Sequence, residues 1–378
     1  MTTRSSGISR RSFLKYPLAA STLALLPWSK SLGSDSMGAG LKVGAQGSAS
    51  SSVPPAAAGW FMPSEQAPHK RCWMAWPARK DIWESQLDDV RKDIARLAQA
   101  IVQYEPVTML TEPDQVAQAT QLCGSSISML AMRVDDTWFR DSGPIFLING
   151  NGELAGSVFN FNGWGNKQTH AKDATVAEEL LKHLGITSFR APFVTEGGAI
   201  ETDGDGTLLV TRPSVYNKNR NPGKTRDQLT QYLCGWLGVK KVVWLPDFHP
   251  DYWTDGHVDG VARFVQPGVV LVDQGLPEVV QYLAQATDAK GRKIKVMELP
   301  RPANVHSSSA TFCNCYLNFY FANGAVIMPQ FGDIQPDAHA REIVAQAYPK
   351  RKLVPIELDT LASGGGLIHC VTQQEPAV

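Results

Sequence analysis

A cysteine close to the end of the sequence is the residue best suited to covalent chemistry. Cys370 ends the segment GGGLIHC at residues 364–370, and a thiolate is a strong nucleophile. Glycine lets a backbone come close to a ligand, so we expect Gly365 to form part of the substrate-binding surface. His369 is adjacent, but along an extended segment it would point the other way. We therefore expect the base that serves the thiol to come from elsewhere in the chain.

Two acidic motifs supply the groups that such a nucleophile needs beside it. The segment WTDGHVDG at residues 253–260 holds His257 and Asp259 two positions apart, which on a strand places both side chains on one face. Asp141, in WFRDSGP at residues 138–144, is a second carboxylate expected to face the same pocket. Two carboxylates repel each other unless a cation lies between them, and a guanidinium pairs with carboxylates through its rigid fork of donors. The set predicts chemistry on a guanidinium carbon.

Each of these residues also has an ordinary structural explanation. A buried cysteine is commonly inert, and Cys72 and Cys313, in strand-like runs, fit that description better than Cys370 does. Asp141 could equally cap a backbone N–H in the turn before a glycine and a proline. The histidine–aspartate pair could equally belong to a solvated turn. The alternatives stay open at this point, because each motif is weak by itself.

The elements that must position these residues alternate along the chain after residue 60. This alternation predicts a single α/β domain over residues 61–378. Apolar runs predict strands at 72–77, 107–111, 157–162, 206–211, 240–246 and 352–358. Helical apolar spacing predicts helices at 88–104, 175–184, 227–237, 276–286 and 339–348. A pair of strands is expected over 261–273, and a hairpin over 311–329 with its turn at Asn323 and Gly324.

The first 60 residues resemble a leader rather than part of the domain. The segment SRRSFLK at 9–15 and the apolar run at 17–28 are typical of a twin-arginine export signal. The run is too short to span a bilayer, so no stable membrane anchor is expected. Residues 31–60 are rich in Gly, Ser, Ala and Pro, as in a flexible lead-in. We therefore expect a periplasmic or secreted protein that uses the Tat export machinery; a chance basic N-terminus is the alternative.

Charge and cysteine content argue against several classes of protein. The 378 residues include 36 basic and 36 acidic side chains. Residues 1–60 hold six of the basic and one of the acidic side chains, which leaves 30 basic and 35 acidic side chains in the domain. A mildly acidic domain lacks the excess of basic residues typical of nucleic-acid binding, though it tolerates a cationic ligand. Six cysteines without a CxxC pair predict neither a disulfide framework nor a zinc site, and no glycine fingerprint for phosphates is present. The oligomeric state is left open, a homo-oligomer included.

Taken together, the motifs resemble those of agmatine deiminases, in the wider family that includes the bacterial, Porphyromonas-type peptidyl-arginine deiminases. The resemblance covers nearly the whole domain, from MPSEQAPHKRCWMAWP at 62–77 to GGGLIHCVTQQ at 364–374. Between these segments stand TWFRDSGP, EGG, TDGHVDG and NFYFANGAVIMPQFGD, in the family's order. The resemblance implies a pentein fold, in which five ββαβ-like units surround a pseudo-fivefold axis and the site lies in the central funnel.

The resemblance also implies a role for each motif residue. Cys370 would be the nucleophile, His257 the general acid and base, and Glu196 the residue that orients His257. Asp141 and Asp259 would hold the guanidinium. The implied enzyme is a hydrolase of linear amidines that converts agmatine to N-carbamoylputrescine and ammonia through a covalent thiouronium on the cysteine, without a metal or an organic cofactor. Agmatine deiminases are typically cytosolic enzymes of putrescine synthesis in polyamine metabolism, and the export signal departs from that habit.

Specificity would be decided beyond the guanidinium. The resemblance implies that Trp138 lines the aliphatic part of the substrate. A distal amine prefers acids or aromatic rings, and such residues flank the histidine: Tyr252, Trp253 and Asp255. The carboxylate of arginine would instead need a basic partner, for which Arg212 or Arg220 would serve.

Three alternatives follow from these residues. The first is a deiminase of peptidyl-arginine or free arginine that makes citrulline. The second is an amidinotransferase, which would share the cysteine chemistry but pass the amidino group to an amine instead of water. The third belongs to another class, a secreted protein that only binds cationic amines. The thiol argues against the third alternative, because a binding protein has no need of a nucleophile.

Overall fold

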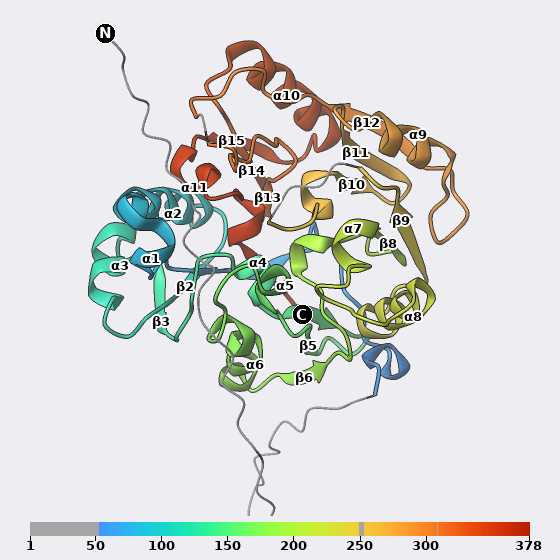
Figure 1. Cartoon of the computed structure of the whole chain (residues 1–378), viewed down its shortest axis with the longest axis horizontal. Helices are drawn as coiled ribbons and strands as arrows, with labels where there is room; N and C mark the ends of the chain where they lie inside the picture. The colour runs from blue at the N-terminus through green and yellow to red at the C-terminus, as the bar shows by residue number, and fades with distance from the viewer. Residues whose placement is uncertain (1–52, 249–252, 308) are drawn as a thin grey trace, which may run out of the picture. The chain divides into compact units, whose positions relative to one another are not determined.

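The computed structural model describes residues 53–248, 253–307 and 309–378, so the predicted export signal and Tyr252 lie outside it. The strands of this part of the chain form five small sheets, four with three strands and one with four. In Figure 1 the sheets follow one another around a ring in chain order. This arrangement agrees with the five units around one axis that the resemblance implied.

Four of the sheets share one plan, in which the first two strands form an antiparallel hairpin and the third lies parallel to the second. Their strands are β4 (Ile145–Ile148), β5 (Leu154–Val158) and β6 (Thr187–Arg190); β7 (Ile200–Thr202), β8 (Thr207–Thr211) and β9 (Lys241–Leu245); β10 (Ala262–Gln266), β11 (Val269–Asp273) and β12 (Lys295–Leu299); and β13 (Tyr320–Ala322), β14 (Ala325–Pro329) and β15 (Lys352–Ile356). The middle strands β8 and β14 are buried along their whole length, which explains their continuous apolar runs.

The remaining sheet joins segments that are far apart in the sequence. β1 (His69–Ala75) is parallel to β2 (Val107–Thr111), and β2 is parallel to β3 (Ser128–Ala131). The antiparallel partner of β1 is β16 (Gln373–Pro376). β16 thus takes the place that the first strand has in the other sheets, and its pairing with β1 closes the ring.

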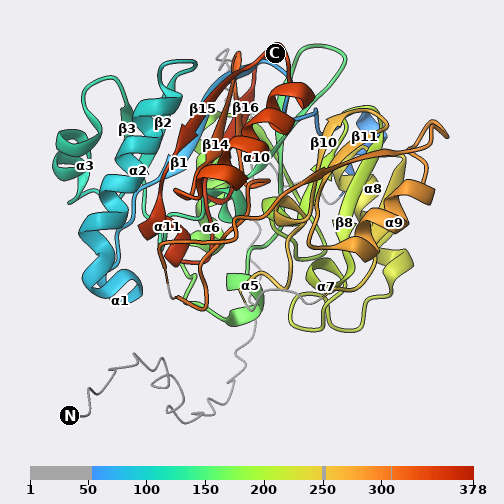
Figure 2. The same ribbon diagram turned by 90° about the horizontal axis from the view of Figure 1, so that it is seen from above.

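The longer helices lie outside the ring of sheets (Figures 1 and 2). Val90, Ile94 and Leu97 form a buried apolar face on α2, at the spacing from which a helix was predicted. The helices are α1 (Lys80–Trp83), α2 (Leu87–Ile101), α3 (Val116–Cys123), α5 (Gly163–Asn166), α6 (Asp173–Leu184), α7 (Arg212–Val215), α8 (Arg226–Leu237), α9 (Pro277–Gln285), α10 (Ile334–Ala347) and α11 (Asp359–Ser363), with 3-10 turns η1 (Pro55–Ala58) and η2 (Glu84–Gln86). None of the helices in the described residues has the length and apolar character needed to cross a membrane.

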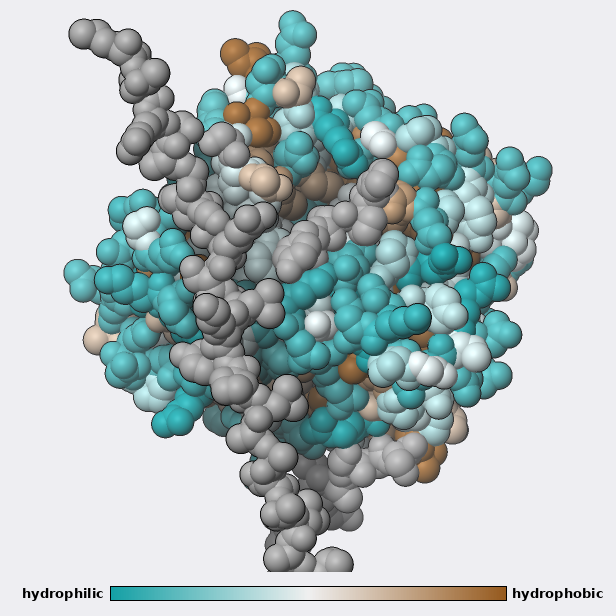
Figure 3. All heavy atoms as spheres, viewed as in Figure 1, coloured by the Kyte–Doolittle hydropathy of each residue, from teal (hydrophilic) through white to brown (hydrophobic). Residues whose placement is uncertain are grey.

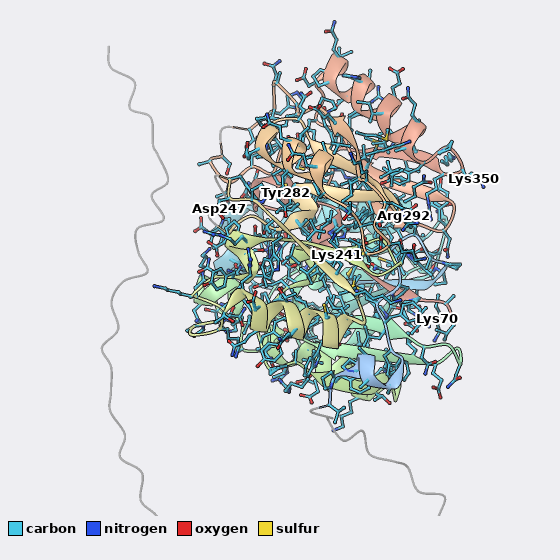
Figure 4. The ribbon with its side chains drawn as sticks, turned by 90° about the vertical axis from the view of Figure 1, so that its right-hand side faces the viewer. Lys70, Lys241, Asp247, Tyr282, Arg292 and Lys350 are labelled. Carbon is cyan, nitrogen blue, oxygen red and sulfur yellow. The ribbon has the colours of Figure 1, made fainter. Side chains whose placement is uncertain are left out.

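The face of the molecule drawn in Figure 3 is mainly polar. On the face shown in Figure 3, outside the grey atoms, hydrophilic residues dominate and hydrophobic ones form only small scattered groups. On the side shown in Figure 4, Lys241 donates to Thr287 at 2.8 Å, and Arg292 pairs with Asp205 at 2.7 Å. These contacts tie the third three-stranded sheet in the chain to the one before it. A surface ion pair such as that of Arg292 and Asp205 contributes little by itself, about 0–1 kcal/mol.

The structure differs from the sequence prediction at several boundaries. Residues 53–60, assigned to the leader, belong to the folded part, because η1 packs on α8 and Trp60 lies against Phe189. The strand predicted at 157–162 ends at Val158, shortly before Asn160 takes a positive φ of 55°. The hairpin turn lies at Asn323–Gly324 as predicted, but residues 311–319 are not a strand. Elements without a sequence prediction include α1, α3, β3, β6, β7, β12 and α11.

Candidate active site

A short helical turn precedes the first strand of most sheets, and these turns meet near the middle of the ring. They are α4 (Phe139–Ser142) before β4, η3 (Gly197–Ala199) before β7, η4 (Val258–Gly260) before β10 and η5 (His369–Val371) before β16. α4 contacts both η3 and η5, and η3 contacts η4; Figure 1 shows α4 in the middle of the ring. The turns carry Asp141, Asp259 and Cys370, and Glu196 and His257 stand directly before η3 and η4. His257 and Asp259 do face one point, the backbone of Gly198, but a turn rather than the expected strand brings this about.

Gly198 is the point around which three of the predicted residues meet. A Cβ atom at this position would lie 2.5 Å from Nδ1 of His257 and 3.0 Å from a carboxylate oxygen of both Asp141 and Asp259. A side chain here would therefore collide with the imidazole and the two carboxylates. Only glycine lets the backbone approach all three groups this closely, and two carboxylates beside an imidazole suit a planar cation such as a guanidinium.

Asp141 is held in place by two donors. Its Oδ1 accepts the backbone N–H of Gly198 at 2.9 Å, and its Oδ2 accepts the indole N–H of Trp164 at 2.9 Å. Burial raises the pKa of this carboxyl group, because the charged form loses its hydration. A cationic substrate would compensate for that loss, so the carboxylate is set up to bind one.

Glu196 lies between the histidine and a buried arginine. Its Oε2 is 3.4 Å from Nε2 of His257, and its Oε1 accepts from Nε of Arg220 at 2.7 Å. Burial opposes a charge on Glu196, but Arg220 and His257 outweigh it and keep the pKa of the carboxyl below its usual value. The carboxylate is thus fixed beside the imidazole, in a position from which it can orient His257.

His257 carries a positive charge at neutral pH. Burial opposes that charge, but the surrounding carboxylates of Asp141, Glu196 and Asp259 outweigh it and raise the pKa of the imidazole to about 9. Its Nδ1 lies 3.7 Å from Oδ1 of Asp141. The imidazole therefore holds a proton that it can give to a leaving group.

Cys370 is buried beside carboxylates. Its sulfur lies 3.6 Å from Oδ2 of Asp259 and accepts an N–H from Asn318 at 3.2 Å. Burial, Asp259 and Asp141 all disfavour the thiolate, so the pKa of the thiol lies well above its usual value. The site without substrate therefore combines a neutral thiol with a charged His257.

His369 is not the bystander that the sequence suggested. Because η5 is a turn and not an extended segment, its side chain also points inward, where Nδ1 lies 2.8 Å from Oδ2 of Asp259. Its Nε2 is 3.0 Å from Glu65, whose carboxylate also pairs with Arg140 at 2.8 Å and Arg263 at 2.7 Å. Burial opposes a charge on Asp259, but the contact with His369 keeps the pKa of its carboxyl below the usual value. His369 thus orients Asp259 and keeps it ionised.

Tryptophan rings form a wall beside the sulfur. A Cβ atom on Gly366 would lie 2.5 Å from Cζ3 of Trp138 and 3.1 Å from Sγ of Cys370. The ring centre of Trp138 lies 5.9 Å from that of Trp83, which itself packs against Gly364. Trp138 therefore lies close to the Cys370 sulfur, its role in lining the aliphatic part of the substrate stays a prediction, and the glycine that adjoins the sulfur is Gly366.

The other predicted binding residues have different surroundings. Gly365, at a φ of 100°, packs against Trp253, since a Cβ atom there would lie 2.9 Å from Cδ1 of the indole. Asp255 pairs with Lys167 at 2.8 Å and with Arg220 at 2.6 Å. Its carboxylate is already bound by two cations of the protein, so its contacts do not favour the predicted role in binding a substrate amine. Asp255 instead holds Arg220 in place.

Several residues of the site had no predicted role. Glu65, Arg140 and Asn318 lie inside the motifs MPSEQAPHKRCWMAWP, TWFRDSGP and NFYFANGAVIMPQFGD, so the motifs contained a signal that reasoning from side-chain chemistry did not use. Trp83 and Trp164 lie outside the motifs that carried the resemblance, and nothing in the local sequence connects them with the site.

Comparison with known proteins places this geometry in a family. The family model of the Porphyromonas-type peptidyl-arginine deiminases matches residues 61–376. The agmatine deiminase of Ectopseudomonas mendocina is 36% identical over 358 residues, which cover 85% of this chain and 97% of that protein. The structure of the Enterococcus faecalis agmatine deiminase is similar with a TM-score of 0.81 and 34% identity, over 86% of this chain and 98% of that one.

The five-sheet ring and its central thiol define a deiminase of the pentein fold, a hydrolase that acts on carbon–nitrogen bonds. The pentein expectation and the resemblance to agmatine deiminases are thereby confirmed. The chain belongs to the Porphyromonas-type peptidyl-arginine deiminase family.

Proposed function

We propose that the protein hydrolyses agmatine to N-carbamoylputrescine and ammonia. The observation that carries the proposal is the convergence of Asp141, Asp259 and His257 on Gly198, with Asp259 also 3.6 Å from the Cys370 sulfur, because two carboxylates beside a thiol suit one guanidinium. Several relatives that match most of the chain are agmatine deiminases by name, which supports agmatine as the guanidine.

The first half of the reaction forms a covalent intermediate. Asp141 and Asp259 hold the guanidinium, whose positive charge beside the sulfur favours loss of the thiol proton to solvent. The Cys370 thiolate attacks the guanidinium carbon and forms a carbon–sulfur bond. In the same step the carbon loses its double bond to nitrogen. His257 gives its proton to one amino group, the C–N bond to that group breaks, and ammonia leaves. A thiouronium on Cys370 remains.

The second half releases the product. His257, now neutral, accepts a proton from a water molecule, and the oxygen attacks the thiouronium carbon. The resulting adduct collapses to a carbamoyl group as the carbon–sulfur bond breaks. The remaining hydroxyl proton passes to the departing thiolate. Cys370 and the protonated His257 are then restored. Glu196 favours this cycle because it stabilises the imidazolium in the same position during both steps.

The alternative that arginine or an arginyl residue is the substrate is not favoured. Of the two basic residues considered for a carboxylate, Arg220 is fully buried and paired with Glu196 and Asp255. Arg212 pairs with Asp247 at 2.8 Å on the surface. Neither is placed to receive a substrate carboxylate without the loss of an existing ion pair.

The proposal predicts which substrate the purified protein consumes. With agmatine, arginine and a C-terminal arginyl peptide assayed side by side at equal concentration, we expect ammonia and N-carbamoylputrescine from agmatine, and at least about tenfold lower kcat/KM for the other two. Turnover of the peptide without turnover of agmatine would show that the substrate is wrong. If none of the three guanidines is consumed, the enzymatic proposal itself fails.

We also propose export by the twin-arginine route, which the SRRSFLK segment and the apolar run after it support. Cells that produce the full chain are expected to contain it in the periplasmic fraction, and replacing Arg10 and Arg11 by lysine should retain it in the cytoplasm. Arg4→Lys, outside the segment, is the matched control and should leave export unchanged. An unchanged periplasmic fraction in the Arg10→Lys, Arg11→Lys variant would refute the proposal.

A further inference from the structure

Asn318 occupies the position that carries a reactive residue in the other four sheets. It lies two residues before β13, the first strand of its sheet, just as Asp141, Glu196, Asp259 and Cys370 lie shortly before theirs. Its side chain is buried, with 2% of the residue exposed. The fivefold arrangement therefore brings a fifth polar side chain to the middle of the ring.

The orientation of the Asn318 amide is fixed by the backbone. Its Oδ1 accepts the N–H of His369 at 2.9 Å and is 3.4 Å from the N of Cys370. A backbone N–H can only donate, so the oxygen must face it and the nitrogen must face the other way. Nδ2 then lies 3.2 Å from Sγ of Cys370, within hydrogen-bond range of the sulfur.

The charges around the sulfur make this donor valuable. Asp259 and Asp141 face the sulfur from η4 and α4, and Cys313 faces it from the loop before β13; all three disfavour a thiolate. The positive charges nearby, on His257 and on His369 when it is protonated, lie against those same carboxylates. An amide N–H directed at the sulfur stabilises a thiolate. Because the amide is uncharged, the neighbouring carboxylates do not pair with it as they would with a cation.

We propose that Asn318 is a further catalytic residue, which donates an N–H to the Cys370 sulfur and so stabilises the thiolate that attacks the substrate. Its oxygen has a second role, since it holds the turn η5 in place through the N–H of His369. The catalytic importance of the donor rests on the proposed hydrolysis of a guanidine, but its effect on the thiol does not. The two can therefore be measured separately.

The test measures the reactivity of the thiol without any substrate. The rate of alkylation of Cys370 by iodoacetamide is followed against pH by mass spectrometry of the peptide that contains it, in the wild type, Asn318→Ala and Asn318→Asp. A hydrogen bond to a charged group is stronger than one to a neutral group, so we expect the midpoint of alkylation to move up by at least about one pH unit in both variants. At neutral pH, alkylation should then be at least about tenfold slower in both.

The two variants separate the effect of the N–H donor from the effect of the oxygen that holds η5 in place. Asn318→Asp keeps an oxygen for the N–H of His369 but loses the N–H donor, whereas Asn318→Ala loses both without adding a charge. A shift in the aspartate variant alone would reflect only the added charge and would overturn the proposal, as would an unshifted midpoint in both. If the alanine variant does not fold, Asn318→Leu, uncharged and of nearly the same size, replaces it.

A control and a second assay complete the experiment. Asn160→Ala also removes a side-chain amide that donates to main-chain oxygens, at Ala191 and Phe193, and should leave the alkylation midpoint unchanged. In the agmatine assay, kcat of the Asn318 variants should fall about tenfold at neutral pH, with KM changed less, and should recover as pH rises toward the pKa of His257, above which the proton donor is lost. A merely structural role would lower the rate equally at every pH. Shifted alkylation without any agmatine turnover would uphold the role of Asn318 and refute the proposed function.

Discussion

Cys370→Ser is expected to lower the rate of agmatine hydrolysis by about 10⁴-fold or more. The hydroxyl of serine is far less acidic than a thiol, and the surrounding carboxylates that already oppose a thiolate would oppose an alkoxide still more. Loss of the nucleophile in enzymes that form a covalent intermediate has effects of this size. Ammonia release gives the rate. Acid-quenched protein examined by mass spectrometry should carry a thiouronium adduct in the wild type and none in the variant.

The matched control for this substitution is Cys234→Ser. Cys234 is partly buried on α8, in a different hydrophobic cluster from Cys370, and makes no part of the candidate site. The variant should hydrolyse agmatine at the wild-type rate. Serine at position 370 that keeps more than about 1% of the activity, or a wild type that never forms the adduct, would contradict the covalent mechanism.

Gly198→Ala is expected to lower the rate by at least about 100-fold while the protein remains folded. The added methyl group would lie 2.5 Å from Nδ1 of His257 and 3.0 Å from oxygens of Asp141 and Asp259, so these side chains must shift. A displacement of reacting groups by about 1 Å can cost about 100-fold in rate. Steady-state kinetics with agmatine should show both a lower kcat and a higher KM, because the carboxylates that would hold the guanidinium are displaced together with His257.

Gly260→Ala provides a close comparison for this second prediction. Gly260 ends η4, next to Asp259, but a Cβ atom there would meet no other atom within 4 Å. The same methyl group should therefore change the rate little. Thermal unfolding of both variants distinguishes a loss of activity from a loss of structure. A Gly198→Ala enzyme with wild-type KM and kcat would mean that the guanidinium binds elsewhere.

Much of the fold was accessible from the sequence, because its signal is local. The helix at α2 and the strand at β2 follow from apolar spacing within a single segment, and the structure has both. The family resemblance supplied what spacing does not contain, the closure of five such units into a ring. Residues 53–60 were missed, since their place in the fold depends on a partner far away in the chain, α8.

The candidate site was predicted in its charged and nucleophilic members but not in the residues that hold them. Cys370, His257 and Asp259 are unusual by type and spacing, so side-chain chemistry alone drew attention to them. Asn318 and Glu65 are ordinary by type, and only the fold brings them to the sulfur and to His369. Asp255 shows the reverse case, because its type suggested a ligand role while the fold surrounds it with arginine and lysine.

The pairing of β16 with β1 has a consequence for biosynthesis. Cys370 reaches the other reactive residues only through η5, and η5 is held by the strand at 373–376 that follows it. A ribosome must therefore polymerise both partners of this closure, more than 290 residues apart, before the thiol can meet its carboxylates. Such non-local contacts form late in folding. A nascent or prematurely terminated polypeptide would thus lack the assembled site. Incomplete chains in the cell would therefore not consume guanidines.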